Sequence, residues 1–342
     1  RREDANVLNE NIPMNERELT IRSWLSEDAK KDFDDMYYAR ALGAASNIRA
    51  IGSMFGDMAS TAAASGLTGA ALIGRVHEVS RYFIEKRGSS SHAIVTAIHI
   101  MTAPLDALAD APLDAACNAV AEAYNTYQAE ARRWNARIME YGWMILEPMD
   151  KILLFDYSST VNAMMETAAT HGKLLDVYIP ESRALDGGHQ FLRNGVRMGH
   201  RMHYFPDVAI AHFVARVDAA FIGAETFYPD GSVSNTVGSD LTGIACAHYG
   251  TPLYVPTSLI KLNPRGYFGF KRREIIEDAS AYFGLHLAPE LKEKIDLCSP
   301  GLINVPASLI TAFITEVGVV PPQAMYEVGK AFLRRIGEEV SA

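Results

Sequence analysis

The spacing of apolar residues changes near Asp150, and the change divides the chain into two halves. In the first half, over about residues 32–147, apolar side chains recur every three or four positions, as they do in SHAIVTAIHIM. This spacing is typical of amphipathic helices. It predicts four or five helices, and the last of them is a long helix over 113–146.

The second half alternates short apolar runs with helical stretches. Such runs are typical of buried strands, and strands separated by helices form parallel sheets with helices on both faces. We therefore predict an α/β fold, with an N-terminal helical domain at 1–148 followed by a Rossmann-like parallel-sheet domain at 149–342. The runs that predict strands are KILLF, LLDVYIP, RMHYF, AAFIGAE, PLYVP and AFITE.

Composition and charge narrow the class of protein. The chain has 342 residues, of which 49% are hydrophobic and 21% charged, and its formal net charge is -9. These values predict a soluble globular protein and argue against a nucleic-acid partner. The basic cluster Lys271-Arg272-Arg273 is interpreted as a solvated helix end.

Cysteine usage and hydropathy predict a cytoplasmic protein that has no membrane partner. The cysteines, Cys117, Cys246 and Cys298, are far apart and suit a reducing compartment. No run approaches the roughly 18 apolar residues of a membrane span. The N-terminal segment RREDANVLNENIPMNE is polar, which is not typical of a secretory signal.

Several common site motifs are missing from the sequence. It contains no Walker A motif, no GxGxxG after a predicted strand, no HExxH, no CxxC and no GxSxG. We therefore expect neither a metal nor an organic cofactor.

Polar residues follow the predicted strands, where ligands of parallel sheets bind. Asp156 and Asp207 each follow such a strand. One interpretation is an acid/base pair, in which one carboxyl holds a proton while the other stays ionised. The alternative is helix capping, because aspartate is a favoured N-cap, and spacing alone favours capping. The other strand-end residues are Glu181, Ser182, Arg183, Glu225, Thr257 and Ser258.

Two further features could bind an anion. Arg183 has a guanidinium that matches phosphate, but a surface ion pair with Glu181 is the alternative. The turn from Asn235 to Ser239 enters a predicted helix, whose backbone N–H groups could bind an anion. A plain connection capped by Ser239 or Asp240 is the alternative there.

Read together, the second half resembles the family of the alpha, beta and delta subunits of translation initiation factor 2B. That family includes methylthioribose-1-phosphate isomerase and ribose-1,5-bisphosphate isomerase. The resemblance runs through ILLFDYSSTV, VYIPESRALDGG, the segment from MHYFPDVAIAH to PLYVPTSLIK, and TEVGVVPP, over about residues 150–325. In the first half, ARALGAASNIRAIG and IEKRGSSSHAIVTAI look like the RGA and RPTAV segments of the isomerases.

The resemblance assigns roles to single residues. Asp207 falls on the family's catalytic aspartate, and Asp156 stands where the isomerases have cysteine. Thr236 stands where they have lysine, while Tyr157-Ser158 looks like the YS of regulatory subunits. The resemblance makes Asp156 and Asp207 pocket residues rather than caps, with Asp207 as the main acid/base and Asp156 as its partner. The remaining substrate-binding residues that it implies are Gly43, Arg87, Arg183, Asn235 and Lys261.

The function that these residues imply is an aldose–ketose isomerase that acts on a sugar phosphate or a related acidic sugar by proton transfer. A non-catalytic regulatory or metabolite-sensing protein is the alternative, and a partner of the translation machinery is a third possibility. The resemblance also implies a homodimer or a higher even homo-oligomer, formed through the second domain. Tyr267, Phe268 and Phe270 could lie at that interface or cover the pocket.

Overall fold

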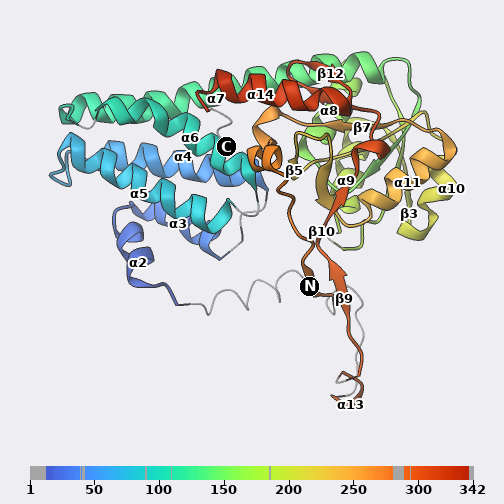
Figure 1. Ribbon diagram of the computed structural model, residues 1–342, viewed down its shortest axis with the longest axis horizontal. Helices are drawn as coiled ribbons and strands as arrows, with labels where there is room; N and C mark the ends of the chain where they lie inside the picture. The colour runs from blue at the N-terminus through green and yellow to red at the C-terminus, as the bar shows by residue number, and fades with distance from the viewer. Residues whose placement is uncertain are drawn as a thin grey trace. The chain divides into compact units, whose positions relative to one another are not determined.

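The computed structural model describes residues 13–38, 40, 43–88, 91–108, 110–184, 186–279, 289–292 and 294–338 (Figure 1). The chain divides into two compact units, Arg1–Arg132 and Arg133–Ala342. The division falls inside the long helix α7, Leu113–Leu146, whose bounds are those expected from the sequence. The domain boundary at 148/149 follows the end of this helix and stays a prediction.

The first unit is helical in the part that the structure describes. Polar caps start several of its helices, because a side-chain oxygen accepts a backbone N–H that the first turn leaves unpaired. Asn15, Ser26 and Thr68 accept such bonds from the residue three positions later. The helices are α2 (Glu16–Ser23), α3 (Glu27–Tyr37), α4 (Ala44–Thr61), α5 (Gly69–Arg87), α6 (His92–Thr102), η1 (Ala103–Leu108) and the first part of α7.

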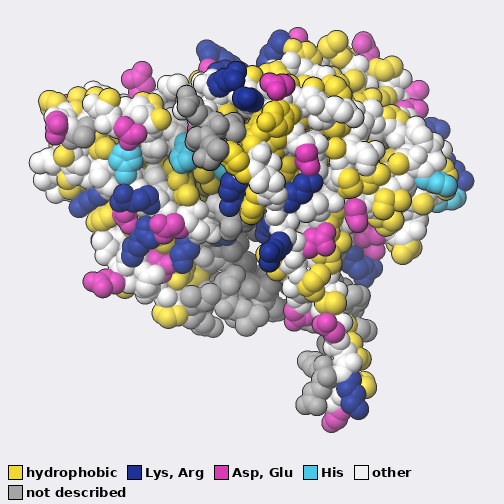
Figure 2. Space-filling view, viewed as in Figure 1, with side chains coloured by type: hydrophobic (Ala, Val, Ile, Leu, Met, Phe, Trp, Pro, Cys, Tyr) yellow, Lys and Arg dark blue, Asp and Glu magenta, His cyan; other side chains and the backbone are white. Residues whose placement is uncertain are grey.

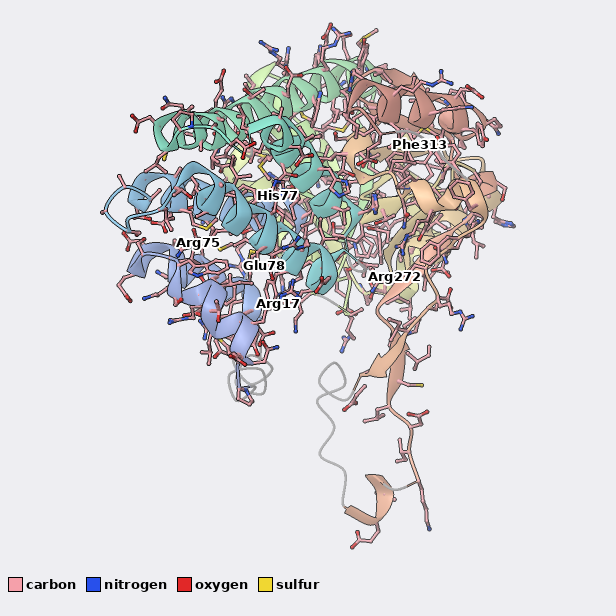
Figure 3. The ribbon with its side chains drawn as sticks, turned by 60° about the vertical axis from the view of Figure 1, so that its left-hand side comes forward. Arg17, Arg75, His77, Glu78, Arg272 and Phe313 are labelled. Atoms are coloured by element: carbon pink, nitrogen blue, oxygen red, sulfur yellow. The ribbon has the colours of Figure 1, made fainter. Side chains whose placement is uncertain are left out.

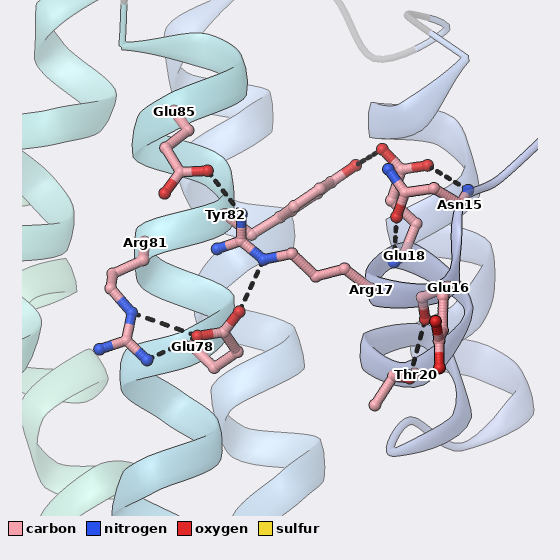
Figure 4. A network of polar contacts seen from close by, with 9 residues as sticks. All are labelled: Asn15, Glu16, Arg17, Glu18, Thr20, Glu78, Arg81, Tyr82 and Glu85. Carbon is pink, nitrogen blue, oxygen red and sulfur yellow. Dashed lines mark hydrogen bonds and ion pairs between the residues drawn. The ribbon is translucent and has the colours of Figure 1, made fainter.

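A polar network joins α2 to α5. Glu18 is only 2% exposed, and it accepts a hydrogen bond from the Tyr82 hydroxyl at 3.2 Å and pairs with Lys86 Nζ at 2.9 Å. Arg17 reaches from α2 to Glu78 of α5 (Figures 3 and 4). Its Nε lies 2.7 Å from Glu78 Oε1. Charge pairs and hydrogen bonds therefore complement the apolar contacts of this short helix.

The second unit is built on a seven-stranded sheet with the order β12-β11-β7-β4-β1-β2-β3. Neighbouring strands are parallel, except that β12 runs antiparallel to β11. Each apolar run identified in the sequence forms a strand of this sheet, so the predicted α/β fold class is confirmed. The strands are β1 (Lys151–Phe155), β2 (Asp176–Pro180), β3 (Arg201–Phe205), β4 (Ala219–Ile222), β7 (Leu253–Pro256), β11 (Ala312–Thr315) and β12 (Gly318–Val320).

Helices of the second unit bury the apolar side chains of the central strands. Ile138 of α7, Met165 of α8 and Phe191 of α9 share one core cluster with Leu154 and Phe221 of the sheet. The area that such residues remove from water stabilises the unit by roughly 25 cal/mol per Å². The helices are α8 (Ser159–Thr170), α9 (Gly188–Met198), α10 (Ile210–Val214), α11 (Ser239–Tyr249), α13 (Pro289–Lys292) and α14 (Met325–Arg335).

A second, three-stranded sheet was not expected. Its order is β10-β6-β5, and its strands are β5 (Thr226–Phe227), β6 (Val233–Thr236) and β10 (Leu302–Val305). The sequence VSNT of β6 is polar, and part of it was interpreted as a turn, but all four of its residues are buried. Tertiary pairing with β10 therefore outweighs a weak local strand signal.

The basic cluster 271–273 does not end a helix. It lies in an extended segment before β8 (Ile276–Asp278), which pairs with β9 (Cys298–Pro300). Lys271 forms an ion pair with Asp230 at 2.6 Å. On the face drawn in Figure 2, Lys and Arg side chains are interspersed with Asp and Glu side chains.

Candidate functional site

The parallel strands bring their carboxyl ends to one edge of the large sheet, and backbone strain gathers there. Asp156, Ser182 and Asp186 are the non-glycine residues with positive φ in the part of the chain that the structure describes, at 54°, 47° and 55°. Asp156 follows β1, while Ser182 and Asp186 lie between β2 and α9. Non-glycine residues in the left-handed region are strained, and such residues cluster at functional sites.

Asp156 is held by two hydroxyl groups. It is 8% exposed, its Oδ1 accepts a hydrogen bond from Ser182 Oγ at 3.0 Å, and its Oδ2 accepts one from Thr236 Oγ1 at 2.6 Å. Donors that point at a carboxylate favour its ionised form. Both oxygens of the buried Asp156 carboxylate are therefore fixed by hydrogen bonds.

Asp207 is held differently, because backbone amides donate to both of its oxygens. Ser182 N–H donates to Oδ1 at 2.8 Å, and Arg183 N–H donates to Oδ2 at 3.0 Å. The carboxylate thus fixes the loop that follows β2. Ser182 links the two acids, since its hydroxyl donates to Asp156 and its amide to Asp207.

The capping interpretation is wrong for both acids. Ser158 is the N-cap of α8 and accepts a hydrogen bond from Val161 N–H at 3.4 Å. Pro206 precedes the short helix η2, Asp207–Ala209, at the end of β3. Asp156 and Asp207 are consequently strand-end residues whose carboxylates bond across the sheet edge.

Arg183 forms the surface ion pair that was the alternative to anion binding. Its side chain is 58% exposed and contacts Glu181 through Nη2 and Oε2 at 3.1 Å. The hydrogen bonds that Arg183 donates to Glu181 raise the pKa of Arg183 above its usual range. An anionic ligand would have to compete with Glu181 for this guanidinium.

Other predicted site residues lie on the segments that flank Asp156. Asn235, on β6, donates a hydrogen bond from Nδ2 to Ser239 Oγ at 2.9 Å, and both residues are buried. Tyr157 packs its ring 5.2 Å from that of Phe191, and burial raises its pKa. A Cβ added to Gly223, at the end of β4, would lie 2.8 Å from Ser158 Cβ. The turn after β1 is therefore tightly packed.

Lys261 lies in the short helix η3 (Leu259–Lys261) after β7, and its side chain reaches the end of β4. Its Nζ donates a hydrogen bond to the carbonyl of Ala224 at 2.6 Å. Burial lowers the pKa of Lys261, while the charge of Glu225 acts in the opposite direction. Sequence reasoning had placed Glu225 at a strand end without giving it a role.

Arg87 and Gly43 lie in the first unit. Arg87 donates from Nη2 to the carbonyl of Met36, and burial lowers its pKa. Gly43 has φ of 81° and precedes α4, where Asn47 Nδ2 donates to its carbonyl at 2.8 Å. Their roles toward a substrate stay predictions.

Sequence reasoning missed Ser182 and underrated Thr236. Ser182 was identified only as a strand-end residue, and Thr236 only as a departure from the isomerases. The sequence did contain a signal for Thr236, because Thr236 and Asp156 both differ from the residues that the isomerases have at these positions. In the structure these two residues are in contact, with Thr236 Oγ1 2.6 Å from Asp156 Oδ2.

The described residues contain neither a metal-binding cluster nor a membrane-spanning helix. Within the described ranges, no group of three or more His, Cys, Asp or Glu side chains could hold a metal ion. No helix among them is long and apolar enough to cross a bilayer.

A mostly parallel sheet with helices packed against it places the chain in the α/β class, in which ligands commonly bind at the carboxyl ends of the strands. The model of the Initiation factor 2 subunit family matches residues 46–322, and the chain belongs to this family. The resemblance inferred from the sequence is therefore confirmed.

Curated relatives include both enzymes and translation factors. A ribose 1,5-bisphosphate isomerase of Archaeoglobus fulgidus is 28% identical over 173 residues, which is 50% of this chain and 54% of that protein. Translation initiation factor eIF2B subunit alpha of Dictyostelium discoideum is 27% identical over 180 residues, 51% of this chain and 56% of that protein. The matches thus span little more than half the length of these relatives.

Solved structures share the fold. Translation initiation factor eIF-2B of Pyrococcus horikoshii OT3 has a TM-score of 0.70 at 19% identity, covering 87% of this chain and 98% of that one. The 5-methylthioribose 1-phosphate isomerase of the same organism has a TM-score of 0.66 at 18% identity, covering 83% of each chain.

Proposed function

We propose that the chain interconverts the aldose and ketose forms of a sugar phosphate or related acidic sugar. The reaction would proceed by proton transfer at the edge of the large sheet where the parallel strands have their carboxyl ends. The observation that carries this proposal is the hydroxyl-bonded carboxylate of Asp156. A buried carboxylate in a strained turn suits a general base. The named activities of the relatives from Archaeoglobus fulgidus and Pyrococcus horikoshii support the same reaction class.

The proposed reaction passes through an enediol. Asp156 removes the proton from the carbon beside the carbonyl, and the electron pair of that C–H bond forms the new C=C bond. The carbonyl π pair moves to oxygen, where Lys261 balances the charge. The hydroxyl on the deprotonated carbon gives its proton to that oxygen, and its own oxygen lone pair forms the new carbonyl. The electron pair of the C=C bond takes the proton back from Asp156 at the former carbonyl carbon, so that the net reaction moves hydrogen without a redox partner.

The other predicted residues have supporting roles in this proposal. The sequence predicts Asp207 as the main acid/base, and this proposal gives it a positioning role instead, because both of its oxygens accept hydrogen bonds from backbone amides of the loop after β2. Lys261 and Arg183 neutralise the acidic group of the sugar, and Asn235 orients a hydroxyl. Tyr157 and Ser158 line the bound substrate.

A regulatory role is the second candidate. The Tyr157-Ser158 pair resembles regulatory subunits, and the alpha subunit from Dictyostelium discoideum matches about as well as the isomerase does. In that case the same edge would bind a sugar without converting it.

Solvent exchange separates the two candidates. The chain is incubated in D₂O with a panel of aldose and ketose phosphates, and proton NMR follows the loss of signal at C1 and C2. We expect exchange and interconversion with one member of the panel. The Asp156→Asn variant should lower the rate on the order of a hundred to ten thousand fold.

The exposed Asp28→Asn variant serves as the matched control and should keep the full rate. Full exchange in Asp156→Asn would contradict the proposed mechanism. Saturable binding of a sugar phosphate without any exchange would favour the regulatory candidate.

A further inference from the structure

The two hydroxyls that meet Asp156 are themselves buried and fixed in place. Ser182 is 1% exposed and Thr236 is 3% exposed. Each hydroxyl has one proton to donate, and each donates it to a different oxygen of the same carboxylate. Rotating either hydroxyl away would cost a hydrogen bond that little solvent can replace.

Different parts of the fold hold these donors. Ser182 has φ of 47°, and its N–H is bonded to Asp207, so the backbone that carries its side chain is fixed. Thr236 lies on β6 and pairs with Leu302 of β10. The large sheet and the small sheet thus each supply one donor to Asp156.

Burial would otherwise oppose ionisation of Asp156, which is 8% exposed. Among the cations on the segments that flank it, Arg183 is engaged with Glu181. A carboxyl that is buried tends to keep its proton unless donors favour the ionised form. The titratable and charged groups on the described segments that flank Asp156 include Tyr157, Glu181, Arg183, Asp186, His189, Asp207, Glu225 and Lys261.

We infer that Ser182 and Thr236 are positioning residues that keep Asp156 ionised and fix the direction of its oxygens. The use of Asp156 as a base rests on the proposed function. The control of its ionisation by the two hydroxyls does not, because it follows from contacts within this chain.

The test is a pH titration in which NMR follows the chemical shift of the Asp156 carboxyl carbon. The protein for this experiment is labelled with ¹³C at the carboxyl groups of its aspartates. The Asp156→Asn variant assigns the signal. Replacing Thr236 by valine removes the hydroxyl at nearly constant volume, and we expect the midpoint of Asp156 to rise by about one to two pH units. The Ser182→Ala variant should raise it in the same direction, and Thr236→Ser should keep the wild-type midpoint.

Thr167→Val is the matched control, because the Thr167 hydroxyl donates to the carbonyl of Ala163 in α8. It should leave the midpoint of Asp156 unchanged. Wild-type midpoints in both Thr236→Val and Ser182→Ala, or an equal shift in Thr167→Val, would overturn the inference. If Thr236→Val does not fold, Ser182→Ala alone decides.

The titration needs no substrate, so it stands even if the isomerase proposal fails. Where turnover is observed, the acidic limb of the pH profile of kcat in Thr236→Val should move to higher pH, together with the NMR midpoint. A purely structural role would lower the rate at every pH and leave that limb in place.

Discussion

A Cβ added to Gly187 would lie 2.1 Å from Asp156 Oδ1 and 2.7 Å from the backbone nitrogen of Tyr157. Gly187 has φ of -67°, so space rather than backbone conformation requires glycine here. At the scale of single residues, the position of Asp156 therefore depends on a neighbour that has no side chain.

The Gly187→Ala variant tests this dependence. The added methyl group must displace Asp156 or Tyr157, and we expect it to lower the free energy of unfolding by about 1–3 kcal/mol. Urea unfolding measures the change. Gly74→Ala is the control, because its Cβ would meet nothing within 4 Å and it lies inside α5. That variant should stabilise the chain by about 0.5–1 kcal/mol, and equal effects would contradict the prediction.

The Asp207→Asn variant tests whether this acid is structural. An amide keeps one acceptor oxygen but turns an N–H group toward one of the two backbone donors, Ser182 or Arg183. We expect a loss of about 1–3 kcal/mol in the free energy of unfolding, because one backbone N–H loses its acceptor. Chemical denaturation measures the loss, and an unchanged midpoint would show that Asp207 does not secure the loop.

At the scale of elements, the helix α2 depends on a buried carboxylate. Burial alone would raise the pKa of Glu18, but hydrogen bonds from Asn15 N–H, Lys86 and Tyr82 outweigh it, and the pKa is lowered. A carboxyl whose pKa is lowered in the folded state stabilises the fold at pH values above its pKa in the unfolded chain. This stabilisation is lost as the pH falls through the lowered pKa of the folded state. Docking of α2 should therefore weaken in acid.

Replacing Glu18 by glutamine should lower Tm most above about pH 5, which exceeds the unfolded pKa of about 4.3. The difference from the wild type should shrink as the pH falls toward the lowered folded value, since both proteins then carry a neutral group. Calorimetry over this range checks the trend. The exposed Glu27, which pairs with Lys30 on α3, supplies a Glu27→Gln control with little effect. A difference that grows in acid would contradict the assignment.

The elements also show what sequence can reveal. KILLF and PLYVP are continuous apolar runs, so burial on both faces marks them as central strands. The strand β6 has no such signal, because its VSNT sequence is polar and its burial comes from pairing with β10. Ser182 could not be recognised for the same reason, since its partners are 26 and 25 residues away along the chain.

At the scale of the whole molecule, the predicted homodimer stays a prediction. Phe268 is 56% exposed and Phe270 is 38% exposed, whereas Tyr267 donates a hydrogen bond to the carbonyl of Tyr326. The two phenylalanines are therefore the members of this aromatic group that could contact a second copy. Exposed aromatic side chains are enriched at interfaces.

Light scattering at micromolar concentration should give at least twice the chain mass of 37.5 kDa. The double variant Phe268→Ser, Phe270→Ser should shift the mass toward the monomer, because it removes the aromatic contacts. Val196→Ser changes a side chain that is 61% exposed on α9 and should have no effect. A monomeric wild-type mass would contradict the prediction.

The hydrogen bond from Thr236 to Asp156 also limits how many residues can lie between β5 and β6 and between β9 and β10. In a strand, successive side chains point to opposite faces, so a one-residue slip of β6 would bring Asn235 or Val237 to the place of Thr236. Leu302 opposite Thr236 fixes the present register, and β9 ends only two residues earlier, at Pro300. Single-residue insertions or deletions between β5 and β6, or between β9 and β10, should therefore be rare among close homologues, even where the loops themselves vary in composition.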